Sequence, residues 1–382
     1  MRRKIYIGGL ALVILINILA WNSPDFCDWH IRYVLPIIVN TYGRLTSLLP
    51  FSAGEIMLVL AVLLTVFGVA FSFWSLIRKD KHKKAVRIYW GAYAWIFWAV
   101  CWIMTLNCFI FYHAPDFEQR YLTYDSGKNG DGDVGGNNES DKKMYSNEEL
   151  AALRDYIVMR CNELAPAFTR DEYGYIIYDK DLFALSQEAM RNLGAEYELL
   201  NGYYVTPKYL KMSAFFTQQN IMGYYFPFSM EANINSMMYI ANVPVTVCHE
   251  LAHTKGFLNE DDANMIGYLA CIKSDDKFMQ YSGYLSVLNY VNSEFYYSIG
   301  KDAAVYKDHA QISSLVSHDN IFLTPAENAK VEQKAVIKTE TVREVSNMFT
   351  DTVLKLNGVE EGRKQYDGVV SLLLQYYDGE LY

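Results

Sequence analysis

Three long apolar stretches, all within the first 112 residues, are the sequence feature that most constrains how this chain folds. They span residues 5–21, 55–77 and 88–112, and Glu55, at the edge of the second, is the one charged residue among them. A helix of about 20 apolar residues is long enough to cross the hydrocarbon core of a bilayer. The first stretch would also suit a signal peptide, but no convincing small-residue cleavage site follows it. We therefore expect three transmembrane helices.

Basic residues mark one side of these stretches. Residues 2–4 are basic, and the connection at residues 78–87 is rich in Lys and Arg. The positive-inside bias places both segments in the cytoplasm. Three crossings then put everything after His113 outside, so we predict a multi-pass protein of the cell membrane with a cytoplasmic N-terminus and an extracytoplasmic C-terminal domain. The first external loop, residues 22–53, is aromatic and poor in charge, which favours a position along the membrane interface.

The rest of the 382-residue chain has the composition of a globular domain. We predict a membrane anchor at residues 1–112, a flexible linker at 113–145 and a folded domain at 146–382. The linker includes residues 125–143, which are rich in Gly, Asn and Asp and too polar to fold. A net charge of −9 without a basic stripe excludes nucleic acid as a partner, and the six cysteines form no CxxC pair.

The folded domain is predicted to be rich in helices. Ser146 and Glu149 form a capping-box pattern that opens a helix to about Leu164. Residues 173–178 and 222–228 carry the aromatic and β-branched bias of strands, while later segments have mostly helical spacing. The expected fold class is therefore mainly α, with three N-terminal transmembrane helices followed by a helix-rich α+β domain.

The sequence His249-Glu250-Leu251-Ala252-His253 is the pattern with the clearest chemistry. Residues four apart share one face of a helix, so His249 and His253 can present two imidazoles to one Zn²⁺ ion. Glu250 then lies beside the open coordination position, where it suits activation of a zinc-bound water. Pro244 and Gly256 fit the start and end of this helix. The alternative is two ordinary helix histidines, which the rarity of the pattern disfavours.

A catalytic zinc site needs a third protein ligand, for which an acidic cluster follows the motif. Glu260 is our candidate, with Asn264 as a hydrogen-bond partner of a ligand histidine; Asp261 and Asp262 remain alternatives because helix phase alone does not fix the start of the helix. Asn259 is a good N-cap, so helix chemistry alone also accounts for the cluster. One helical face carries Glu260, Asn264, Gly267 and Cys271.

These two motifs resemble the gluzincin signature, HExxH followed by Glu-x-x-Ala-Asp/Asn, although the gap between them is short here. The pattern also resembles an uncharacterised bacterial family, common in Firmicutes, known only as a domain of unknown function. That resemblance spans nearly the whole chain and rests on the three apolar stretches, Phe226-Pro227-Phe228, Glu231-Ala232-Asn233, Pro244, HELAH, Gly256-Phe257, Glu260-Asp261-x-Ala263-Asn264 and Tyr281-Ser282-Gly283-Tyr284. It implies an extracytoplasmic, zincin-like, zinc-dependent hydrolase and no particular substrate.

Further candidates for substrate binding carry weaker signals. Tyr225 and Phe226 lie in the predicted strand upstream of the motif, which suits either an edge strand that binds an extended peptide or a core strand. Glu231 and Asn235 suit a cleft or, more ordinarily, a solvated helix face. Tyr281 is one of several candidates for stabilising an oxyanion, each of which packing explains equally well. The others are Tyr284, His309 and His318.

The sequence thus predicts a membrane-anchored zinc metallopeptidase with Zn²⁺ as its cofactor. Its partners would be the lipid bilayer and a peptide or protein substrate, cut near the outer membrane surface by a Glu-activated, zinc-bound water. The alternatives are a non-enzymatic extracytoplasmic binding domain with a structural metal, and a zinc amidase acting on cell-wall material. The intact Glu250 and the open ligand set argue against a structural metal, because structural zinc sites close all four positions.

Overall fold

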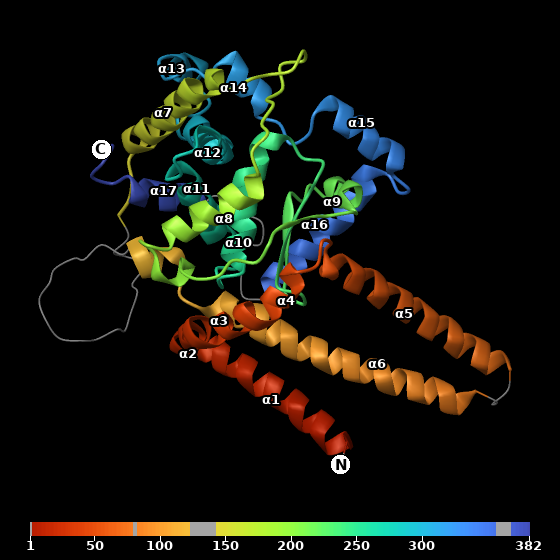
Figure 1. The fold of residues 1–382 in the computed structure, drawn as a ribbon. Helices are drawn as coiled ribbons and strands as arrows, with labels where there is room; N and C mark the ends of the chain where they lie inside the picture. The colour runs from red at the N-terminus through yellow and green to blue at the C-terminus, as the bar shows by residue number, and fades with distance from the viewer. Residues whose placement is uncertain (1, 79–81, 123–142, 357–367) are drawn as a thin grey trace, which may run out of the picture.

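The computed structural model describes residues 2–78, 82–122, 143–356 and 368–382. Figure 1 shows three long helices projecting from a helix-rich body. These are α1 (Arg2–Asn22), α5 (Ala53–Ile77) and α6 (Lys83–Met104). All three are long and apolar enough to cross a membrane, and α6 continues through a π-helical turn and a 3-10 turn up to His113. The three predicted apolar helices are therefore confirmed, and they indicate a membrane protein.

The connection between α1 and α5 is almost continuously helical. Its elements are α2 (Pro24–Trp29), η1 (His30–Val34), α3 (Leu35–Ile38), η2 (Val39–Gly43) and α4 (Arg44–Ser47). We call residues 24–49 the bridging segment. Its inner face is buried against the body through Cys27, Ile31, Leu35 and Val39, whereas its outer face exposes Trp29, Tyr33, Ile37, Leu45 and Leu48. Exposed apolar side chains in such a row are unusual for a surface in contact with water.

The body is built around the helix that carries the HELAH motif, α10 (Val243–His253). It packs against α8 (Leu182–Leu193), α11 (Glu260–Ile272) and α12 (Lys277–Ser298). The first helix of the body, α7 (Asn147–Leu164), begins at the predicted capping box, which is fully formed. The remaining helices are α9 (Ser213–Gln218), α13 (Ala303–Lys307), α14 (Ser314–Asp319), α15 (Pro325–Lys334), α16 (Thr339–Leu356) and α17 (Gly368–Tyr376).

A small mixed sheet lies beside α10. It contains β1 (Lys208–Tyr209), β2 (Gly223–Phe226) and β3 (Glu231–Ile234) in the order β1-β3-β2. β2 runs antiparallel to β3 and is an edge strand, while β1 runs parallel to β3. The strand predicted at residues 222–228 is confirmed.

The strand predicted at residues 173–178 is wrong. This segment forms a tight turn with a single bridge between Arg170 and Ile176. The Asp171 carboxylate accepts hydrogen bonds from the backbone N–H groups of Tyr173 and Tyr175. An Asp side chain that binds the backbone in this way favours a turn over a strand.

The stretch predicted to be a linker falls into two parts. Residues 123–142 lie outside the described residues. Residues 113–122 belong to the folded body, because Phe117 is fully buried against Tyr197 and Phe257. The folded body therefore begins directly after α6 and its extension.

Candidate metal centre

The two motif helices are joined by a sharp turn whose residues explain its shape. Pro244 occupies the first turn of α10, where its missing N–H costs nothing. Gly256, at φ +93, ends the helix in the left-handed conformation that glycine adopts most easily. The Asn259 side chain then accepts a hydrogen bond from the Asp261 N–H and starts α11. The turn returns the chain so that α11 begins beside the C-terminal half of α10.

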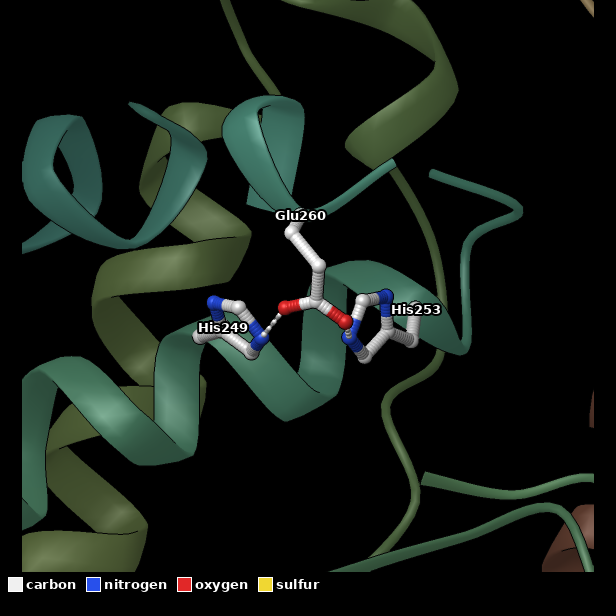
Figure 2. A group of neighbouring side chains, drawn as sticks. All are labelled: His249, His253 and Glu260. Carbon is white, nitrogen blue, oxygen red and sulfur yellow. Dashed lines mark ion pairs between the residues drawn. The ribbon is translucent and has the colours of Figure 1, made fainter. Parts of the chain in front are cut away.

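Three potential metal ligands converge where the helices meet (Figure 2). Nε2 of His249 lies 3.1 Å from Oε2 of Glu260, and Nε2 of His253 lies 3.9 Å from Oε1 of the same carboxylate. The ligand atoms of the three residues all lie within 4.8 Å of one another. The structure brings Glu260 to the histidines, whereas Asp261 and Asp262 lie outside this cluster and are buried.

The other ring nitrogen of each histidine has its own partner. Nδ1 of His249 lies 2.9 Å from Oδ1 of Asn264, and Nδ1 of His253 lies 2.7 Å from the carbonyl oxygen of Phe257. Because a carbonyl oxygen only accepts hydrogen bonds, Nδ1 of His253 carries the proton, and the same holds for His249 facing an amide oxygen. Both Nε2 atoms therefore point into the cluster, where each can bind a metal ion when it carries no proton.

The charges of the cluster are strongly coupled. Burial favours the neutral form of both partners, but the hydrogen bond between His249 and Glu260 and the attraction of their charges together outweigh it, raising the pKa of His249 to about 9 and lowering that of Glu260 to about 2. Burial, together with the charge of His249, lowers the pKa of His253 to about 4. Without a metal, the positive charge of doubly protonated His249 balances the Glu260 carboxylate. His253 is neutral and can act as a ligand.

Glu250 lies beside this cluster on the same helix and is buried. Burial raises the pKa of its carboxyl to about 8. Its Oε2 atom is fully covered and has no hydrogen-bond partner among the described residues, while the N–H of Tyr225 in β2 faces the carboxylate. A methyl group at Gly223 would lie 2.5 Å from Oε1 of Glu250, so β2 approaches this carboxylate as closely as only glycine permits.

Gly267 sets the distance between the two motif helices. A side chain on Gly267 would lie 3.1 Å from the carbonyl oxygen of Val245 and 3.3 Å from the backbone nitrogen of His249. The helices therefore touch backbone to backbone at the level of the first histidine. This close approach allows the short side chain of Asn264 to reach the imidazole of His249.

Three of the weaker candidates have structural contacts instead of a place in the cluster. Tyr225 is buried and its hydroxyl donates to the carbonyl oxygen of Asn107. The buried Tyr281 hydroxyl donates to Asp319. Phe226 is half-buried and packs against Gly54 at the start of α5.

Glu231 was expected on a helix face or in a cleft, and both expectations are wrong. It lies in β3 and is buried in an ion pair with Lys208. Its carboxylate also accepts hydrogen bonds from the N–H groups of Ala53 and Gly54. Asn235 is likewise buried and binds the Thr217 hydroxyl through its amide. Glu231 thus holds the sheet and α5 together, whereas Asn235 joins the end of β3 to α9.

The other three candidates for an oxyanion donor also have partners elsewhere. The Tyr284 hydroxyl lies 3.2 Å from that of Tyr156, and Nδ1 of His309 lies 2.8 Å from Asp155. The His318 ring packs against Tyr175. None of the three belongs to the ligand cluster.

Comparison with known proteins gives a family and no activity. The family described as "Protein of unknown function (DUF3810)" matches residues 30–374. This range contains most of the bridging segment, α5, α6, the sheet and both motif helices. No curated protein and no solved structure matches the chain.

Proposed function

The chain belongs to the DUF3810 family of proteins of unknown function, and from its candidate metal centre we propose that it is a membrane-anchored zinc metallopeptidase. The observation that carries this proposal is the convergence of His249, His253 and Glu260, with both Nε2 atoms turned inward by acceptors at Nδ1. A helix-rich body with a short sheet beside the HExxH helix supports a zincin-like fold.

The donor set fits zinc. Two imidazole nitrogens and one carboxylate are the ligands that catalytic zinc sites combine, leaving the fourth position open. The set contains no thiolate, which structural zinc sites commonly use, and a fully oxygen-based set, which Mg²⁺ or Ca²⁺ would need, is also absent from the cluster. When bound, zinc supplies a Lewis acid that polarises the scissile carbonyl and lowers the pKa of water.

Glu250 supplies the proton transfers. Its buried carboxylate has an unpartnered Oε2 atom, and an unpartnered acceptor in a desolvated site is a strong base for an attacking water. Oε2 would hold the proton taken from water and return it to the amine leaving group as the peptide C–N bond breaks. The raised pKa of Glu250, caused by its burial, matches a group that must both accept and release a proton near neutral pH.

The free edge of β2 supports a peptide as the substrate. The N–H of Asn235 binds the carbonyl oxygen of Met222, so alternation along the antiparallel ladder turns the N–H and C=O groups of Gly223 and Tyr225 away from β3. Of these groups the N–H of Tyr225 faces the Glu250 carboxylate, and the α-carbon of Gly223 lies against the same carboxylate. An extended peptide that pairs with them would lie beside the candidate metal centre.

The proposed location is the outer face of the cell membrane. The basic residues before α1 and between α5 and α6 support cytoplasmic positions for those segments. The body follows the third apolar helix, so it would lie on the opposite side.

The decisive experiment measures bound metal and hydrolysis on the purified full-length protein in detergent. Wild type should bind close to one zinc per chain and cleave unstructured peptides. His253→Ala should lose both properties, while Glu250→Gln should keep zinc and lose hydrolysis by about 10²–10⁴-fold. His318→Ala, which changes a histidine outside the cluster, is the matched control and should keep both.

Two results would contradict the proposal. If the wild-type protein binds no zinc after purification in the presence of zinc, the candidate metal centre is not a zinc site. If Glu250→Gln hydrolyses peptides as fast as wild type does, this carboxylate does not transfer the proton.

A further inference from the structure

We propose that this centre acts on polypeptides tethered to the same bilayer, at a bond about four residues outside it. This inference rests on the proposed function and names its substrate class. It follows from where the structure holds β2 between the membrane helices and Glu250. The argument begins with the level of the membrane surface.

The bridging segment marks that level. Its two ends continue into the membrane-spanning helices α1 and α5, so both ends lie at one membrane face. Between them, its outer face exposes a row of apolar and aromatic side chains while its inner face packs on the body. A helix of this kind, with Trp and Tyr among its exposed residues, suits the interface between headgroups and acyl chains. The row is Trp29, Tyr33, Ile37, Leu45 and Leu48.

The C-terminal end of β2 is fastened to this level. The Tyr42 hydroxyl of the bridging segment donates to the carbonyl oxygen of Phe228, 2.7 Å away. Asn107, in the helical extension just beyond α6, donates its amide to the carbonyl oxygen of Pro227 at 2.9 Å. Phe226 packs directly on Gly54 in the first turn of α5. The turn that follows β2 therefore rests on the membrane surface.

The N-terminal end of β2 lies beside the Glu250 carboxylate. Gly223, the first residue of the strand, lies against the Glu250 carboxylate, which the N–H of Tyr225 also faces. Four residues of strand separate this point from the turn, which is about 13 Å at about 3.3 Å per residue. A chain that leaves the bilayer and pairs along the free edge of β2 would thus reach Glu250 after about four residues. The strand acts as a spacer between the bilayer and the scissile bond.

The membrane next to β2 has room for a tether. Residues 56–63 of α5 are all exposed, so no described part of the chain covers this outer stretch of the helix. α5 meets α6 only further down, where Thr65 binds Tyr93 and Trp90 binds Ser72. Figure 1 shows α5 and α6 converging away from the body and diverging toward it. A transmembrane helix or an acyl chain in the outer leaflet can therefore approach the turn after β2.

The test uses wild-type full-length protein, with zinc bound, in lipid vesicles. One substrate joins a transmembrane helix of about 20 apolar residues to an unstructured stalk. A second carries the same stalk on a palmitoyl chain, and a third is the stalk alone. We expect the tethered stalks to be cut at least about tenfold more efficiently, because sharing a membrane raises the effective concentration. If both tethered stalks are cut at equal rates, the protein recognises the position of the stalk at the bilayer and not the anchor. If one is preferred, that preference identifies the kind of anchor.

The position of the cut is the sharper readout. Inserting a Gly-Ser spacer between the anchor and the stalk should leave the cut at the same distance from the bilayer, in a different sequence. A cut that moves outward with the stalk sequence, or an untethered stalk cut as efficiently as a tethered one, would overturn this inference and leave the peptidase assignment intact. Absence of cleavage in all three substrates and in unstructured soluble peptides would instead overturn the proposed function, and this inference with it.

Discussion

Among single residues, Asn264 offers a direct test of how the imidazoles are oriented. Its amide oxygen accepts the Nδ1 proton of His249 and so directs Nε2 toward the proposed zinc ion. Asn264→Ala removes the acceptor, and losing such a partner of a ligand typically costs about 10–100-fold in metal affinity. Competition with a chelator of known affinity measures the change in zinc binding.

Asn264→Asp is the matched variant, since a carboxylate at the same position still accepts the Nδ1 proton. It should hold zinc far better than Asn264→Ala does. Equal weakening by both substitutions would show that Asn264 acts through packing between α10 and α11 and has no role in orienting His249.

Gly223 tests the approach of β2 to Glu250. The methyl group of Gly223→Ala would lie 2.5 Å from Oε1, so the carboxylate has to move away while the three ligands stay in place. Misplacement of a reacting group by about 1 Å can cost about 10²-fold in rate, and we expect that loss in kcat with zinc content unchanged. Gly91→Ala is the control, because nothing lies within 4 Å of its added methyl group and its activity should equal wild type. Normal activity of Gly223→Ala would contradict the placement of the proton-transfer group.

The candidate ligands could be predicted from the sequence because they follow helix spacing. His249 and His253 are one turn apart, and Glu260 and Asn264 are one turn apart on the next helix, so each pair falls on one face. The acceptor for His253 is a backbone carbonyl, that of Phe257, and every residue has one. No sequence signal could single it out, and the same holds for the closeness of Gly223 to Glu250, which depends on tertiary packing.

Among the elements, the first turn of α5 is held by the sheet. Glu231 in β3 pairs with Lys208 and accepts the N–H groups of Ala53 and Gly54, which begin α5. Glu231→Gln would leave the buried Lys208 ammonium without a counter-charge, and breaking a buried pair in this way costs about 3–5 kcal/mol. Unfolding in detergent, followed by tryptophan fluorescence, should show this loss.

Glu163→Gln is the control for this measurement. Glu163 is largely exposed in its surface ion pair with Arg160, and such surface pairs contribute about 0–1 kcal/mol. A loss for Glu231→Gln no greater than that for Glu163→Gln would mean that the contacts between β3 and α5 add little to stability.

The elements that were predicted carry local sequence signals, whereas those that were missed depend on contacts between side chains and distant or backbone groups. The long apolar helices and α7 carry local signals, length in one case and a capping box in the other, and were predicted. Glu231 was misplaced because a charged residue between apolar neighbours looks solvated, whereas here Lys208 and a helix N-terminus neutralise it in a strand. The turn near Asp171 was mistaken for a strand because its aromatic residues have strand propensity while the side chain of Asp171 binds the backbone.

For the whole molecule, the remaining question is which side of the membrane carries the body. The basic residues around α1, α5 and α6 favour the cytoplasm for the N-terminus and for the connection after Ile77. Met144, just before α7, is almost fully exposed, and Lys84 is exposed at the start of α6. A membrane-impermeant maleimide should therefore label Met144→Cys in intact cells and Lys84→Cys only after permeabilisation.

Labelling is readable in this protein because five of the six native cysteines are buried and the sixth, Cys101, is partly covered within α6. The cysteine-unmodified chain gives the background for both variants. The reverse pattern, with Lys84→Cys labelled in intact cells, would place the candidate metal centre in the cytoplasm. The proposed zinc binding by His249, His253 and Glu260 would be unaffected. The tethered substrates, however, would have to present their stalks on the cytoplasmic side. The reason is that β2 sets a distance only from the membrane face on which the bridging segment lies.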